Sequence, residues 1–541
     1  MLRRDFTYLV SRVLVEHHPC LEFLQSVCVK HIPHQFSKEM AKKTEKVLLG
    51  VIFKSENKSE EMLDILKQIR SYSPNLENAD QTLRRSIPIV GDQLTVERGV
   101  NVIQAVQNSY TPEEKLEGIH MEIADWHTAV TFLNVFFKRH YSTISDTDKG
   151  TLFADRNLIN RRNVTADVHS NWVHCKAFAI LEIKARIIAA AMLVLGMKKI
   201  SDQPTHNLSP VAARSGNDQE KKHYLMKLSG QIVDQFVIDQ HSLNSFLDGI
   251  LSEQEKNDAV NNQELTTDGR FPCRSPGCNN SFKYDGKRRR DHELTHDPPP
   301  VIPEKPVLSS NYPKKGSLSD LDDDDDVFNY NCSLLAQGLL FLNFLDSTSE
   351  GDGDRSIRCW KFFLLHFKED KSTTKYALEA LYLLLQVYSL LPPAEAHSLV
   401  WNRTVNNKGG PGKNVAIDLD LEHDNNDLKQ PIKNLGPNVT EDAVRRISNG
   451  QQKSKQMLSC MDREILVKQR SGKHVSADYS KDLRAVVNSL IEESVFCRTP
   501  GRHYKHFSNF VRDPLSRLDM SNLYQWINKH KKNIDLARKA R

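Results

Sequence analysis

Four residues near the middle of the chain have the types and the spacing of a metal site. Four residues separate Cys273 from Cys278, and thirteen more lead from there to His292. Three residues then separate His292 from His296. A tetrahedral zinc ion needs four thiolate or imidazole donors that converge on one point, and a cysteine hairpin facing two histidines one helical turn apart supplies them. The pattern therefore predicts a Cys2His2 zinc site.

The residues around this predicted site are those of a zinc finger, with two departures. Phe271 precedes the first cysteine and Phe282 follows the second, where so small a unit needs aromatic packing. The segment between the cysteine pair and the histidine pair is one residue longer than usual, and Arg289 stands three before His292, where a core leucine is expected. The finger is also present once. One finger contacts roughly three base pairs, so a single copy gives little sequence specificity.

Charged residues precede the first histidine of the predicted finger. The positions that would face bases are Asp285, Arg288 and Asp291, and two acids there oppose docking into a phosphate-lined groove. Beside them lies a basic run that predicts a phosphate contact or a nuclear import signal. The run consists of Lys287, Arg288, Arg289 and Arg290. The alternative interpretation is a zinc-clamped structural knob whose charges are only solvated.

A second set of candidate residues consists of carboxylates. Asp92 and Asp125 each follow a short apolar run, which in a sheet would carry both side chains to the same edge. Neighbouring carboxylates repel, and two Mg²⁺ or Mn²⁺ ions would neutralise them and activate a nucleophile and a leaving oxygen. Glu379 is the candidate third acid, with Glu422 second. The alternative is that these acids only cap helices and form turns, and we interpret His127 likewise as a capping or core residue.

Composition bounds the class of protein. With 541 residues, 39% hydrophobic and 26% charged, the chain predicts a soluble globular protein of roughly three or four domains or subdomains. Nine cysteines without a disulfide framework indicate a reducing compartment. The sequence predicts no secretory signal and no membrane span, and the run 187–197 is expected to be a buried core helix. The last thirteen residues, with six Lys or Arg against one Asp, account for the whole net charge of +5.

Apolar periodicity predicts a mostly helical α+β protein with a small mixed sheet around Asp92 and Asp125. The abrupt start suggests that an amino-terminal part is missing. Prolines and an acidic run, Asp322 to Asp326, predict a flexible linker after the finger. The expected divisions are a helical region (1–85), the first part of a core with a helical insertion (86–260), the finger (268–298), the linker (299–328), a helical second part of the core (329–470) and a basic tail (471–541).

Several stretches of the chain resemble a multi-copy eukaryotic family known only as a domain of unknown function. They include IPIVGDQLTVERG, ADWHTAV, DKGTLFADRNLINRRNV, EGDGDRSIRCWKFFLLHF, KYALEALYLLLQVYSLL and LVWNRTVNNKGGPGKNVAIDLDLEHDNN. The likeness covers roughly residues 1 to 470, and family members often carry a Cys2His2 finger inside the domain. The family is similar to transposon-encoded proteins. The resemblance implies a degenerate ribonuclease-H-like core of the kind found in DDE transposases, with Asp92, Asp125 and Glu379 as its metal ligands.

Three functions follow from these predictions. The leading hypothesis is a transposon-derived zinc-finger protein that contacts DNA or chromatin in the nucleus. The second is a metal-dependent DDE-type DNA transposase or nuclease, and the third is a structural interaction protein with a zinc-stabilised knob. A cytoplasmic location is the alternative to the nucleus, and the sequence names no protein partner.

Overall fold

The computed structural model describes residues 1–74, 86–238, 249–251, 270–284, 286–300, 324–467 and 478–538. Two compact units are present. The larger, here called the helical body, comprises Met1–Asp239, Asp325–Leu518 and Trp526–Arg541. The smaller, here called the finger unit, comprises Gln240–Asp324 and Asp519–Gln525. The finger predicted at 268–298 lies within the smaller unit.

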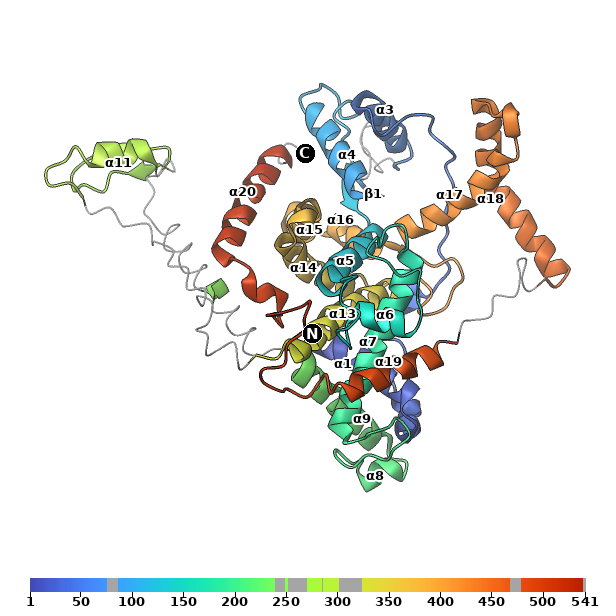
Figure 1. Cartoon of the computed structure of the whole chain (residues 1–541). Coiled ribbons are helices and arrows are strands. Elements are labelled where there is room, and N and C mark those ends of the chain that lie inside the picture. Colours follow the sequence, from blue (N-terminus) through green and yellow to red (C-terminus); the bar gives the residue numbers. More distant parts are fainter. Residues whose placement is uncertain are drawn as a thin grey trace. The chain divides into compact units, whose positions relative to one another are not determined.

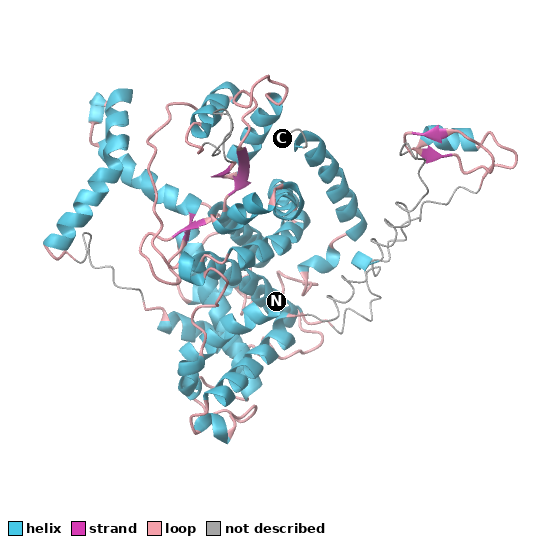
Figure 2. Ribbon diagram, turned by 180° about the vertical axis from the view of Figure 1, so that it is seen from behind, coloured by secondary structure: helices cyan, strands magenta, loops and turns pink. Residues whose placement is uncertain are grey.

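The structure confirms a mostly helical protein with a few small sheets (Figures 1 and 2). The longer α-helices are α1 (Leu2–His17), α3 (Ser59–Arg70), α4 (Gln93–Ala105), α5 (Asp125–His140), α7 (Trp172–Leu195), α9 (Asp218–Ile232), α13 (Asp326–Glu350), α14 (Gly353–Glu369), α15 (Thr374–Leu385), α17 (Ile417–Lys433), α18 (Glu441–Glu464), α19 (Ser480–Glu492) and α20 (Met520–Arg538). None of the described helices combines the length and apolarity that crossing a membrane requires.

Short helices and strand pairs complete the described residues. The short α-helices are α2 (Ser37–Met40), α6 (Leu152–Leu158), α8 (Val211–Arg214), α11 (Lys287–Glu293) and α16 (Pro393–Trp401). The 3-10 helices are η1 (Pro19–Val27), η3 (Lys371–Thr373), η5 (Gly436–Asn438) and η6 (Pro514–Arg517), and the π-helical turns are η2 (Val233–Val237) and η4 (Gln386–Leu390). The strands pair as β1 (Ile87–Gly91) with β2 (Ile119–Ile123), β3 (Phe271–Pro272) with β4 (Ser281–Phe282), and β5 (Thr404–Val405) with β6 (Val415–Ala416).

The core of the helical body forms around α13, which packs against α1, α5, α7 and α14. Aromatic side chains fill the space between these helices, and the Phe132 ring stacks on Phe363 with centroids 4.3 Å apart. As predicted from residues 187–197, α7 is a buried core helix. It ends at Gly196, whose φ of +66° is a left-handed conformation that favours glycine. Its two buried charged residues pair with each other, since the Arg186 guanidinium binds the Glu182 carboxylate.

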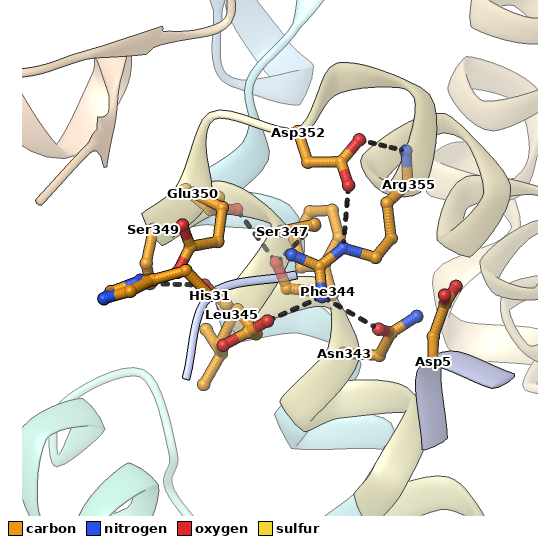
Figure 3. A network of polar contacts seen from close by, with 12 residues as sticks. Asp5, His31, Asn343, Phe344, Leu345, Ser347, Ser349, Glu350, Asp352 and Arg355 are labelled. Carbon is orange, nitrogen blue, oxygen red and sulfur yellow. Dashed lines mark hydrogen bonds and ion pairs between the residues drawn. The ribbon is translucent and has the colours of Figure 1, made fainter. Parts of the chain in front are cut away.

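A buried polar network joins the end of α13 to the start of α14 (Figure 3). Arg355, which is fully buried, donates to Asp352 through Nε at 3.1 Å and to Asp346 through Nη1 at 2.6 Å. Asp352 also caps α14 by accepting from the Arg355 backbone N–H. His31 approaches from the amino-terminal region and lies 2.7 Å from the Glu350 carboxylate. Because unpaired buried charge is costly, these contacts fix the α13–α14 corner.

The strand pair β1–β2 is parallel, with Ile87 opposite Ile119 and Gly91 opposite Ile123. Parallel strands need a crossover element, and α4 supplies it. The strands expected before Asp92 and Asp125 are therefore present, but they form a two-stranded parallel sheet and not the expected mixed sheet. In a parallel pair the carboxyl ends of both strands lie at the same edge. Asp92 and Asp125 follow these strand ends and therefore lie at the same edge of this sheet.

Two segments differ from the expected linker and tail. Asp325 and Asp326, from the acidic run, are buried at the start of α13 and bind residues of the carboxyl-terminal region. That region was expected to be a basic tail, yet α19 packs against α7 in the core. Asp322 and Asp323 lie outside the described residues. The helix α20 covers most of the basic terminus, whose last three residues also lie outside the description.

Candidate functional site

The four predicted metal ligands of the finger unit come together. One donor atom from each of Cys273, Cys278, His292 and His296 lies within 4.8 Å of the other three. The Cys273 Sγ is 3.4 Å from His296 Nε2, the Cys278 Sγ is 3.3 Å from His292 Nε2, and the two Nε2 atoms are 3.2 Å apart. In the part of the chain that the structure describes, this is the one group of three or more His, Cys, Asp or Glu side chains that could hold a metal ion.

Local structure explains this convergence. The antiparallel strands β3 and β4 form a hairpin, and the Cys273 backbone N–H donates to Asn280 O at 2.8 Å. The helix α11 carries His292, with His296 just beyond its end, so the two imidazoles stand one turn apart. Phe282 packs on the His292 ring with centroids 5.3 Å apart, as its position in the sequence predicted.

Arg289 belongs to the interior of the finger and not to its surface. Only 3% of this residue is exposed, and its Nε donates to Glu293 Oε1 at 3.0 Å. Glu293 is fully buried and accepts from the Arg274 guanidinium at 2.7 Å and from the Arg274 backbone N–H at 3.0 Å. The Arg289 guanidinium also lies over the Phe271 ring, 5.6 Å from its centroid. A buried ion pair thus replaces the leucine that the pattern of ordinary fingers led us to expect.

The rest of the basic run faces outward. Lys287, Arg288 and Arg290 are exposed on α11, and so is Asp291. Tyr284 is 70% exposed just before the helix, and the Lys283 ammonium lies 5.6 Å from the centroid of its ring. Asp285, the other predicted base-facing acid, lies outside the described residues. The finger therefore presents three helix cations and one exposed aromatic ring.

Asp92 and Asp125 have different surroundings at the sheet edge. Asp92 is the N-cap of α4, and its Oδ1 accepts from the Thr95 backbone N–H at 2.8 Å. Asp125 is buried and is held by Arg403, whose Nη2 donates to Oδ1 at 2.6 Å and whose Nε donates to Oδ2 at 3.0 Å. The indole Nε1–H of Trp360 donates to Oδ1 of the same carboxylate at 3.0 Å. Arginine, and not a second carboxylate, is the neighbour that neutralises Asp125.

Glu379, the candidate third acid, is a buried residue of α15. Burial raises the pKa of the nearby Tyr376, and the charges of Asp92 and Glu379 raise it further, so both carboxylates lie near this ring. The described residues nevertheless contain no acidic group that converges as the cysteines and histidines do. Asp92, Asp125 and Glu379 thus share one region of the body without forming a preassembled ligand set.

The residue that the sequence did not single out is Asp418, at the start of α17. Its carboxylate accepts from the backbone N–H groups of Trp126 at 3.1 Å and His127 at 3.0 Å, which caps α5 from a distant part of the chain. The same carboxylate lies 2.9 Å from the His127 Nδ1. No local signal predicts this contact, because 291 residues separate the partners.

His127 is therefore an oriented imidazole at the carboxyl edge of the sheet. Burial lowers its pKa, but the hydrogen bond to Asp418 and the charge of that carboxylate raise it. The charges of Asp92 and Glu422 act in the same upward direction, and the net shift is upward. Asp92 and Glu422 thus each lie within electrostatic reach of His127. Glu422 lies one helical turn after Asp418 on α17.

Comparison with known proteins gives one match. The sequence model of a family of unknown function, DUF6589, matches residues 1–474. The chain belongs to this family, which confirms the resemblance to a domain of unknown function over about residues 1 to 470. No curated protein and no solved structure matches the chain.

Proposed function

We propose that this member of the DUF6589 family uses its finger unit as a zinc-stabilised module that contacts nucleic acid. The observation that carries the proposal is the convergence of Cys273, Cys278, His292 and His296. Zinc bound at about 2.3 Å to sulfur and about 2.0 Å to nitrogen separates a sulfur from a nitrogen ligand by about 3.5 Å and two nitrogen ligands by about 3.3 Å. The sulfur–nitrogen and nitrogen–nitrogen separations of 3.2 to 3.4 Å are close to these values. When bound, the ion would hold the hairpin against α11.

The surface of the finger supports nucleic acid as the partner. Lys287, Arg288 and Arg290 can neutralise phosphates, and an exposed ring such as Tyr284 is a platform on which a base can stack. The exposed acid Asp291 opposes insertion into the major groove. This combination favours weak, salt-sensitive contact with backbone and unpaired bases over sequence reading in a duplex. In this proposal the protein is of transposon-derived type and acts in the nucleus.

The zinc part of the proposal is tested by metal analysis of the purified full-length chain. We expect one zinc ion per chain, and Cys273→Ser should remove it while the helical body stays folded, because that body has its own buried core. Far-UV circular dichroism and thermal melting report on the body. A metal content well below one per chain, or zinc retained by the Cys273→Ser variant, would overturn the site.

The nucleic-acid part is tested by replacing Lys287, Arg288 and Arg290 with Gln. The variant should keep its zinc, and its affinity for single-stranded oligonucleotides at 50 mM salt should fall at least tenfold. Tyr284→Ala should weaken single-strand binding more than duplex binding. A matched control replaces three exposed lysines of the helical body, Lys222, Lys227 and Lys429, with Gln. Equal losses for the two triple variants, or none for either, would leave the finger as a structural knob that binds protein partners or none.

A second function is favoured by one observation at the sheet edge, the His127–Asp418 pair in the field of Asp92 and Glu422. A carboxylate that orients a histidine is a common support for metal binding or proton transfer. Asp92, His127 and Glu422 do not converge as the four finger ligands do, so they would have to move closer together to hold Mg²⁺ or Mn²⁺. The ion would then supply charge stabilisation for phosphoryl transfer in a degenerate ribonuclease-H-like core. In this interpretation Glu422 takes the place first considered for Glu379, and Asp125 serves as structural support.

A DNA nicking assay with Mn²⁺ tests this second function. Asp92→Asn and Glu422→Gln should each abolish nicking, whereas Glu379→Gln should leave most of it. A purified, well-folded chain that neither nicks DNA nor changes its melting temperature on addition of Mn²⁺ would exclude the activity. Loss of nicking in Glu379→Gln but not in Glu422→Gln would restore the ligand set of Asp92, Asp125 and Glu379.

A further inference from the structure

The carboxyl-terminal half of α18 exposes a cluster of large apolar side chains. The cluster, here called the α18 stripe, consists of Met457, Leu458, Met461 and Ile465, and Leu466 follows it. Each of these side chains is between 44% and 83% exposed. Exposed apolar residues are common singly, but a contiguous set of this size marks an interaction surface. Figures 1 and 2 show α18 leading away from α17, with this half clear of the other helices of the body.

Among the described residues, the side-chain contacts that attach α18 to the body come from another side of the helix. Its one buried residue is Ser448, and Gln452 one turn later bonds to the backbone of Lys46 and Leu48. Lys455 continues the same side and binds the Asp424 carboxylate at 2.6 Å. At 3.6 residues per turn, the Leu458, Met461 and Ile465 positions lie roughly 110° away around the helix axis. The polar side of α18 is thus attached to the body, and its apolar side is presented outward.

The spacing of the stripe is that of a helix seam. Leu458, Met461 and Ile465 fall at intervals of three and four residues, which is the spacing by which paired helices interlock. Ser454 and Gly450 continue the seam toward the amino end with small residues. A partner helix of similar length would cover the whole stripe.

The charges along α18 indicate which helix that is. Lys453 precedes the stripe, and Glu464 lies at its carboxyl-terminal end. Lys453 and Glu464 are both exposed. An antiparallel copy of the same helix places Lys453 of one chain at the level of Glu464 of the other, and this contact occurs twice because the pair has two-fold symmetry. A parallel copy would place lysine beside lysine.

We propose that the carboxyl-terminal half of α18 pairs antiparallel with the same helix of a second copy of this chain. Leu458 and Met461 form the seam, and Lys453 lies beside Glu464 of the partner. The surface belongs to the helical body and is independent of zinc and of nucleic acid.

The test measures the oligomeric state of the full-length chain by sedimentation equilibrium. The wild type should dimerise at micromolar concentration. Leu458→Glu with Met461→Glu should raise the dissociation constant at least tenfold, whereas the matched pair Gln456→Glu with Ser459→Glu, on other sides of the helix, should change it little. All four side chains are exposed, so these variants should fold, and thermal melting checks this.

A charge exchange tests the antiparallel direction. Lys453→Glu and Glu464→Lys should each weaken the dimer, and the two together should restore it. Cys460, the one exposed cysteine of the nine, provides a second readout, because a short bismaleimide should cross-link the wild type and not Cys460→Ser. A chain that stays monomeric at 100 μM, or a dimer indifferent to Leu458→Glu with Met461→Glu, would overturn the proposal. Failure of the charge exchange to restore the dimer would overturn the antiparallel direction.

Discussion

Individual charged residues inside this protein are held by partners from distant parts of the chain. Glu350 lies 2.7 Å from the His31 ring across 319 positions, and Arg403 binds Asp125 across 278 positions (Figure 3 shows the first). The types of these residues are visible in the sequence, but their pairing is not. This matters for Asp125, because a carboxylate beside Asp92 suggests repulsion, while a carboxylate beside Arg403 is already neutralised.

Asp125→Asn should therefore lower the free energy of unfolding in metal-free buffer, although repulsion between neighbouring acids would have predicted an increase. The variant leaves the buried Arg403 guanidinium without its counter-charge, and breaking a buried ion pair costs about 3–5 kcal/mol. Urea unfolding measures the change. Arg403→Met combined with Asp125→Asn removes both charges and should cost less than Asp125→Asn alone. A stability gain in the single variant would contradict this account.

His366 on α14 should make the protein less stable in acid. Burial, and then the charge of Arg139, lower its pKa to about 3. In the unfolded state His366 has an ordinary pKa near 6.5, so between pH 6.5 and 3 it binds a proton there but not in the folded state. The free energy of unfolding therefore decreases as the pH falls from 6.5 toward 3. The loss attributable to this residue is about 1.4 kcal/mol per pH unit.

Urea unfolding of the wild type and of His366→Phe at pH 7, 6 and 5 checks this prediction. The variant keeps a ring against Phe132 and should lose less stability per pH unit than the wild type. Some dependence should remain, because burial also lowers the pKa of His18, to about 4. Equal slopes for both proteins would show that His366 is not responsible.

At the scale of elements, local sequence patterns predicted individual strands and helices, but they did not predict which distant elements pack together. The apolar runs before Asp92 and Asp125 predicted the strands β1 and β2. The spacing of cysteine, histidine and phenylalanine predicted the hairpin and helix of the finger. Both are encoded within short windows of sequence, where turn, cap and side-chain period act together.

The packing of α17 against α5 could not be predicted from local patterns. Asp418 caps α5 and orients His127, but its own surroundings in the sequence, Ile417-Asp418-Leu419-Asp420, indicate only a helix start rich in acids. The same limit applies to Arg289. Its position predicted a leucine, and the compensating partner Glu293 became evident only when the burial of both was known.

At the scale of the whole molecule, the carboxyl-terminal region completes the helical body although the family match ends at residue 474. The α19 side chains Leu483, Val486, Val487 and Leu490 are buried. Arg502 binds the Asp325 carboxylate at 2.8 Å, and the His503 and His506 rings approach Asp326 and Asp148. The basic composition of this region predicted a solvated tail. Composition does not show that an acidic partner such as Asp325 lies 177 residues away in the sequence.

Removal of the residues after 477 should therefore destabilise the body and not merely shorten it. Four buried aliphatic side chains contribute about 1.5–3 kcal/mol each, and Asp325 would lose its counter-charge. Because a truncated chain can aggregate, Arg502→Met in the full-length protein provides the second measurement. It should cost about 2–3 kcal/mol, less than a fully buried pair, since 23% of the Arg502 side chain is exposed. Asp325→Asn combined with Arg502→Met should recover part of that loss. If the chain truncated after residue 477 has the same melting temperature as the full-length protein, the carboxyl-terminal region does not stabilise the body.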